Sequence, residues 1–248
     1  MTDQLSLRLE TELPNLPDTL RPMLPRLLGE AFDSEDHLFE PSWGGTRALA
    51  YIGPAAAAGG GEVRLVGADG QDLAALPELA GLAVRVDARS AVLDGELVVV
   101  DALGRADAAE LARRLDGRGG RAVAFLAFDL LHLDGRSLLS LPLFRRRDLL
   151  RRVLRPGDEV VAVPAIAAEG RALFDAVAAQ GIAGVMARQR SSPYLSGVRS
   201  RLWRFVPAGG AGAADGPGAD SAAEPPVGPA SAPVLALIRR LPLLDEDE

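Results

Sequence analysis

The sequence contains no cysteine, and every one of the 27 positions counted as lysine or arginine is an arginine, so lysine is absent as well. The lack of cysteine excludes disulfides, thiol nucleophiles and Cys-ligated zinc. The lack of lysine excludes Schiff bases, lysyl-nucleotide intermediates and the phosphate-binding lysine of a Walker motif. Because the arginine guanidinium stays charged where a lysine amine can become neutral, arginine does not replace lysine as a nucleophile.

Long apolar runs are also missing. No stretch approaches the ~18–20 residues needed to cross a bilayer, and residues 1–14 carry acidic side chains without the apolar core of a signal peptide. The 248 residues are 48% hydrophobic and 25% charged, which is typical of globular proteins. We therefore expect a cytoplasmic protein that makes no membrane contact, with one sizeable domain or two small ones.

The composition changes abruptly after Pro207. Residues 208–233 are almost all Ala, Gly, Pro, Ser, Asp and Glu, which predicts a flexible linker. Residues 234–248 form a short apolar segment and an acidic tail. Residues 208–248 hold seven acids and two arginines, so they supply −5 of the net charge of −7. We expect a folded domain over residues 1–207 and a still unknown protein partner for the acidic tail.

Short apolar runs alternate with segments of helical period between residues 38 and 207, which predicts an α+β fold with antiparallel sheets flanked by helices. The predicted strands are residues 38–52 with a turn at 44–45, 62–66, 91–100, 123–131, 159–163, 184–187 and 201–206. The predicted helices are residues 77–86, 106–115, 143–154 and 172–180.

Five short motifs occur in order within this region. They are EPSWGGTR at 40–47, LDGE at 93–96, FDLL at 128–131, AGVMAR at 183–188 and WRFVP at 203–207. Together they resemble the adenylation (nucleotidyltransferase) domain of ATP-dependent DNA ligases of the bacterial repair type, over about residues 20–207. The resemblance implies an ATP-grasp-like fold, with no OB-fold domain in this chain.

The resemblance also assigns roles to residues. Nucleotide contacts are expected from Glu40, Arg47, Glu96, Phe128 and Arg188, with Phe128 stacking on adenine and Glu96 near a metal ion. For Phe128, a core role is the alternative, because aromatic side chains in apolar strands are more often buried. The cofactors implied are ATP and Mg²⁺.

The sequence departs from the family pattern where the chemistry takes place. Ser42 stands where the family has its nucleophilic lysine, and Ala183 stands where it has a metal-binding glutamate. Phe205 and Pro207 replace two lysines that stabilise phosphate charge in the family. Because phosphoryl transfer depends on positioned cations, we predict that the chain forms no lysyl-AMP and binds ATP and Mg²⁺ weakly or not at all.

Clusters of arginine suggest a weak DNA-binding surface. The residues selected are Arg145, Arg146, Arg151, Arg199 and Arg201. For the arginines of residues 143–154, the alternative is the solvated face of a helix whose leucines point inward.

These observations predict a ligase-like pseudoenzyme of a DNA repair or recombination lineage that binds nucleotide or DNA. Whether the chain is an enzyme stays open at this point. One alternative is an active ligase or AMP transferase that uses Ser42 or groups supplied by a partner. The other is a non-catalytic protein-interaction module.

Overall fold

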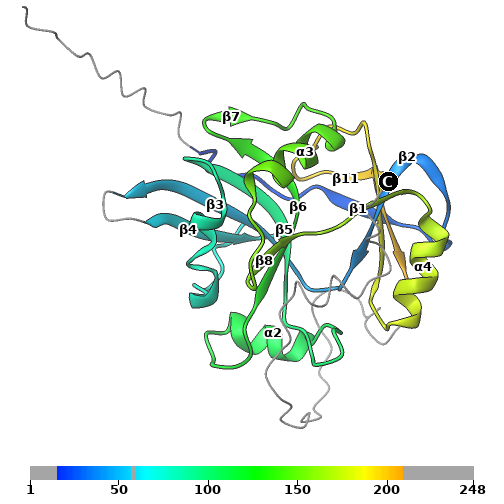
Figure 1. Cartoon of the computed structure of the whole chain (residues 1–248), viewed down its shortest axis with the longest axis horizontal. Coiled ribbons are helices and arrows are strands. Elements are labelled where there is room, and N and C mark those ends of the chain that lie inside the picture. The colour runs from blue at the N-terminus through cyan, green and yellow to red at the C-terminus, as the bar shows by residue number, and fades with distance from the viewer. Residues whose placement is uncertain (1–15, 57–59, 209–248) are drawn as a thin grey trace, which may run out of the picture.

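Two β-sheets carry most of the described chain (Figure 1). The structure is a computed structural model that describes residues 16–56 and 60–208. In these residues sheet A has the strand order β1-β11-β10-β2-β9, where the strands are β1 (Leu24–Leu27), β11 (Arg199–Pro207), β10 (Gly184–Gln189), β2 (Ser34–Ser42) and β9 (Ile166–Ala168). Sheet B has the order β4-β3-β5-β6-β7, where the strands are β4 (Gly60–Gly67), β3 (Thr46–Ala56), β5 (Ala91–Val98), β6 (Ala124–Leu133) and β7 (Arg136–Ser137). A further strand, β8 (Val160–Ala162), pairs with β6.

The helices cover the outer faces of the sheets. A 3₁₀ helix (Pro77–Leu79), α1 (Leu82–Arg85), α2 (Ala108–Leu115) and α3 (Leu143–Val153) contribute leucines to a core under sheet B. The last helix, α4 (Gly170–Ala179), packs on sheet A through Leu173 and Val177, as its place beside β2 in Figure 1 shows. Burial of these apolar faces is the main force that holds the helices on the sheets.

A third group of buried side chains lies between the two sheets. It includes Met23, Leu49, Val92, Tyr194 and Trp203. The register explains which functional residues join them. Glu40 pairs with Met186, Ser42 with Gly184, and Arg188 with Trp203. Because directly opposed residues of neighbouring strands point to the same face of a sheet, Glu40, Ser42, Arg188 and Trp203 share one face of sheet A.

The predicted α+β fold is confirmed, and most strand pairs are antiparallel as expected. Two pairs are parallel, β1 with β11 and β6 with β8. The predicted turn at residues 44–45 separates β2 from β3. None of the helices in the described ranges is long and apolar enough to cross a bilayer. Apart from Ala208, the predicted linker and tail lie outside the described residues.

One prediction of local structure is wrong, and three short strands were not predicted. Residues 77–86 form a 3₁₀ turn and the short α1 instead of one helix, because Gly81 interrupts the segment and glycine is unfavourable inside a helix. The short strands β1, β7 and β9 have no sequence signal. In β1 the motif LPRL even contains Pro25, which is tolerated because β1 is an edge strand.

Candidate functional site

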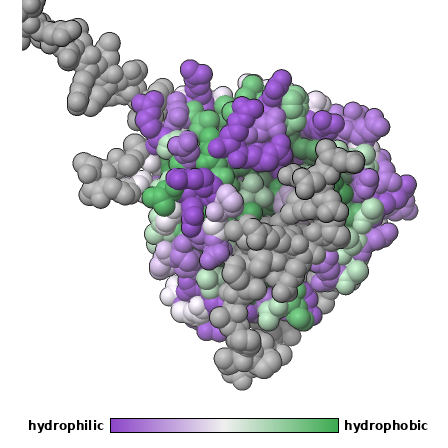
Figure 2. Space-filling model, in the orientation of Figure 1, coloured by the Kyte–Doolittle hydropathy of each residue, from purple (hydrophilic) through white to green (hydrophobic). Residues whose placement is uncertain are grey.

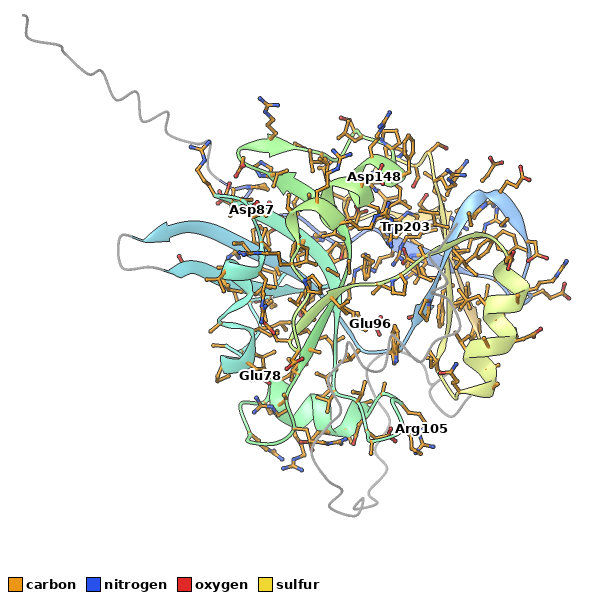
Figure 3. All side chains as sticks on the ribbon, viewed as in Figure 1. Glu78, Asp87, Glu96, Arg105, Asp148 and Trp203 are labelled. Atoms are coloured by element: carbon orange, nitrogen blue, oxygen red, sulfur yellow. The ribbon has the colours of Figure 1, made fainter. Side chains whose placement is uncertain are left out.

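Ser42 ends β2, and the turn that follows holds it against sheet B. Gly44 adopts a left-handed conformation with φ +76°. A side chain at Gly45 would collide with the carbonyl oxygen of Leu97 and approach Glu96. The two glycines therefore let the backbone after Ser42 lie directly on β5, which carries Glu96 (Figure 3).

Glu96 is held at this turn by hydrogen bonds. The backbone N–H of Gly45 donates to its Oε1 atom. Burial raises the pKa of the Glu96 carboxyl above its ordinary value, while the hydrogen bond from Gly45, the charge of Arg47 and the neighbouring Gly44 and Ser42 act in the opposite direction. Glu96 therefore contacts the turn that follows Ser42, with the backbone N–H of Gly45 as the donor.

Glu40 lies two residues before Ser42 and is 1% exposed. Its carboxylate forms ion pairs with Arg147 of α3 and with Arg188 of β10. Arg147 also donates to the carbonyl oxygens of Phe128, at 2.8 Å, and Val163, at 2.6 Å. A buried carboxylate needs such partners, because an unpaired charge in the interior costs several kcal/mol.

Arg188 joins sheet A to two buried aromatic side chains, Phe128 and Trp203. Its Cζ atom is 4.0 Å from the centre of the Phe128 ring and 4.7 Å from that of Trp203. The side chain is 2% exposed, and burial lowers its pKa. Among the described residues its Nε and Nη1 atoms have no hydrogen-bond partner, so its contact with Glu40 is an ion pair. Arg188 is therefore held by one carboxylate and two aromatic rings.

Arg47 reaches the same rings from sheet B. Its Cζ atom is 4.4 Å from the centre of the Phe128 ring. Its guanidinium makes two hydrogen bonds to Asp94, of 2.5 and 2.6 Å, and the Tyr194 hydroxyl donates to the same carboxylate at 2.6 Å. Burial alone would lower the pKa of Arg47, but the ion pair with Asp94 raises it above its ordinary value.

The described residues do not fit a Mg²⁺ site on their own. Mg²⁺ is bound by several oxygen ligands in near-octahedral geometry. Within residues 16–56 and 60–208, no three histidine, aspartate or glutamate side chains form a cluster that could hold a metal ion. Asp94 and Glu40 are already paired with arginines, and position 183 is alanine. The metal role predicted for Glu96 stays a prediction.

The region around Ser42 also lacks cations at Phe205 and Pro207, the two positions where the family pattern has lysines. Phe205 pairs with Met186 across β10 and β11, on the same face as Ser42. The ring of Phe205 packs against Gly184. Next to it, the backbone N–H of Ala208 donates to the carbonyl oxygen of Ala183 at 2.9 Å. Near Ser42, this wall is therefore formed by apolar side chains and backbone.

One predicted DNA contact is wrong. Arg146 is 0% exposed and forms a two-bond ion pair with Asp129, with both distances 2.8 Å. It is part of the core and cannot reach a DNA backbone from there. Arg145, Arg151, Arg199 and Arg201 are exposed, and Figure 2 shows hydrophilic side chains gathered over α3. Their DNA contacts stay predictions.

The sequence reasoning missed Arg147 and Asp94 as members of the site. A signal for Arg146 and Arg147 exists, because residues 143, 146, 147 and 150 lie on one face of an α-helix. Leu143 and Leu150 on that face are buried. Two arginines at inward positions predict buried carboxylate partners, which here are Asp129 and Glu40.

Comparisons with known proteins agree with this geometry. A family model described as "ATP dependent DNA ligase domain" matches residues 30–204. The "Multifunctional non-homologous end joining protein LigD" of Mycobacterium bovis is 37% identical over 166 residues, which are 66% of this chain and 21% of the relative. A "Probable DNA ligase" of Sorangium cellulosum is 34% identical over 207 residues and covers 75% of this chain and 37% of that protein.

A solved structure with the same fold is titled "mycobacterial DNA ligase D complexed with ATP and MES". It superposes with a TM-score of 0.64 at 33% identity and covers 77% of this chain and 60% of that chain. The present chain thus spans about a fifth to two fifths of the curated relatives' length. Because the family model covers well over half of the sequence, the chain belongs to the family of ATP-dependent DNA ligase domains.

Proposed function

We propose that the chain is a non-ligating member of this family that binds DNA in a repair setting and transfers no nucleotide. The observation that carries the proposal is position 42. The nucleophile position of the motif frame holds a serine, and the whole sequence has no lysine to replace it. A serine hydroxyl is a weak nucleophile unless an adjacent base removes its proton.

The surroundings of Ser42 support the same proposal. Attack on a phosphate requires positioned positive charge, because the transition state carries spread negative charge. Phe205, Pro207 and Ala183 supply none. The guanidinium groups of Arg47 and Arg188 are already paired with Asp94 and Glu40. The positive charges of these two arginines are therefore balanced by carboxylates of the protein itself.

DNA is the ligand that the surface favours. Exposed arginines bind backbone phosphates without regard to sequence, and each contact adds to the salt dependence of binding. Arg199 and Arg201 lie on β11, and Arg145 and Arg151 lie on α3. All four side chains reach solvent.

A specific contact favours the alternative of an active enzyme. The Ser42 side chain is a neighbour of Glu96, a carboxyl group whose pKa is raised by burial. Such a carboxyl group is a candidate base for a serine nucleophile. The active alternative therefore requires Ser42, whereas DNA binding without ligation does not.

One substrate tests both proposals. The protein is incubated with ATP, MgCl₂ and a nicked duplex that carries a 5′ phosphate, and binding and sealing are measured together. We expect salt-dependent binding without sealing. Sealing that disappears in Ser42→Ala would establish the active alternative. Absence of DNA binding at low salt would instead leave a protein-interaction module.

Paired variants test the surface. The double variant Arg199→Ala with Arg201→Ala should weaken DNA binding and lower the salt slope by about 0.9 for each phosphate that the protein no longer neutralises. Arg113→Ala with Arg118→Ala removes the same charge near α2, where both side chains are also exposed. Equal weakening by the two pairs would contradict a DNA surface at β11.

A further inference from the structure

We infer that Arg188 occupies the place of a nucleobase among the buried side chains between the two sheets and so keeps bases out. The inference rests on the proposed function in one premise, that a non-ligating member of this ligase family keeps the place of a nucleotide site between its two sheets. The inference names Arg188 as the residue that decides whether a nucleobase can enter the site. It concerns the base and not the phosphates of a nucleotide.

Two groups that a nucleobase with an exocyclic amine requires lie in this region between the sheets. Such a base stacks on an aromatic ring, and its amine donates to an acceptor such as a carboxylate. Phe128 of β6 offers the ring and Glu40 of β2 offers the carboxylate. Both are buried, at 4% and 1% exposure.

Arg188 contacts both the Phe128 ring and the Glu40 carboxylate. The guanidinium is planar, with donors around its edge, so it can stack and donate at the same time as an aminopurine does. Its Cζ atom is 4.0 Å from the centre of the Phe128 ring, and its Nη1 atom pairs with Glu40. Trp203 lies 4.7 Å from the same guanidinium. A base cannot take up this position unless Arg188 leaves it.

The rest of the cluster would survive removal of the Arg188 guanidinium. Arg147 still pairs with Glu40 and still donates to the carbonyl oxygens of Phe128 and Val163. Arg188 leaves its own Nε atom without a hydrogen-bond partner among the described residues, so a smaller side chain loses little hydrogen bonding there. Methionine retains apolar volume and removes the charge. Arg188→Met is therefore the variant of choice.

Adenosine is the probe, because it carries the base without phosphate and requires no metal ion. Its binding to the full chain is measured by calorimetry and by quenching of tryptophan fluorescence. We expect adenosine to bind Arg188→Met at least about tenfold more tightly than the unchanged protein, because an occupied site lowers apparent affinity by the fraction that is open. Arg152→Met, a change of the same type at an exposed position of α3, should leave binding unchanged.

Several outcomes overturn the inference. One is adenosine binding by the unchanged protein as tight as binding by Arg188→Met. Another is a folded Arg188→Met that binds no better. Arg188→Lys provides a second variant, which keeps the charge, loses the planar group and should bind adenosine with intermediate affinity. Failure of both variants to fold would make Arg188 a structural core residue. Adenosine carries no phosphate, so it cannot be transferred to the protein or to DNA. Failure of Arg188→Met to bind adenosine more tightly would therefore leave the proposed absence of ligation intact.

Discussion

At the residue scale, the arginines of α3 show how strongly position decides role. Arg145 is exposed, whereas Arg146, the next residue, is buried against Asp129. Arg146 also donates to the carbonyl oxygen of Ser192 at 3.0 Å, which ties α3 to the loop before Tyr194. The two side chains are chemically identical, so the difference in their effects comes from burial and from the partners that Arg146 has in the core.

Arg146→Ala should lower the free energy of unfolding by about 3–5 kcal/mol, because it leaves the Asp129 carboxylate buried without a cationic partner. Chemical denaturation measures this as a shift of the midpoint at similar slope. Arg145→Ala is the matched control and should change stability by about 0.5 kcal/mol or less. Similar losses in the two variants would contradict the core role of Arg146.

Glu96 makes stability depend on pH in a predictable direction. Burial raises its pKa in the folded state above the ordinary value of 4.5. A carboxyl group with a raised folded pKa stabilises the fold below its unfolded pKa, and this contribution is lost as the pH rises through the folded value.

Glu96→Gln cannot ionise, so its stability relative to the unchanged protein should increase as the pH rises from about 4 towards 7. The amide oxygen can still accept the hydrogen bond from Gly45. Unfolding curves at several pH values measure the difference. A difference that does not vary with pH would show that the Glu96 pKa is the same in the folded and unfolded states.

At the element scale, β5 and β6 form the centre of sheet B and carry much of the site. Gly95 of β5 lies directly under β6. A Cβ atom at Gly95 would lie 2.7 Å from the carbonyl oxygen of Leu126 and would also meet the ring of Phe125. The close approach of these two strands therefore requires glycine at this position.

Gly95→Ala should destabilise the fold by about 1–3 kcal/mol, since overpacking forces side chains and backbone to shift. Gly81→Ala is the control, because no atom lies within 4 Å of the Cβ position there. Thermal and chemical unfolding measure both. A loss at Gly81 as large as that at Gly95 would contradict the steric explanation.

The sequence was informative for elements with strong local signals. The turn between β2 and β3 and the apolar strand β6 follow from Gly44-Gly45 and from a continuous apolar run. The edge strands β1 and β9 are not predictable in this way, because their neighbours in sheet A, β11 and β2, are far away in the sequence. The same reason hides the contact of Arg188 with Phe128 and Glu40, which joins three strands.

At the scale of the whole molecule, the side chains where the two sheets face each other differ from one end to the other. One end holds a buried network of Arg47, Arg147 and Arg188 with their carboxylate partners. The other end holds Ser42 beside apolar residues such as Phe205. The family model matches residues 30–204, while position 42 holds a serine and position 183 an alanine.

Intact-protein mass spectrometry after incubation with ATP and MgCl₂ tests the central claim most directly, with an active ligase domain in parallel to show that an adduct is detected. The predicted result is an unchanged mass, because neither Ser42 nor any lysine is available as an activated nucleophile. A mass increase of one AMP that is absent in Ser42→Ala would contradict the claim and establish this protein as an active nucleotidyltransferase.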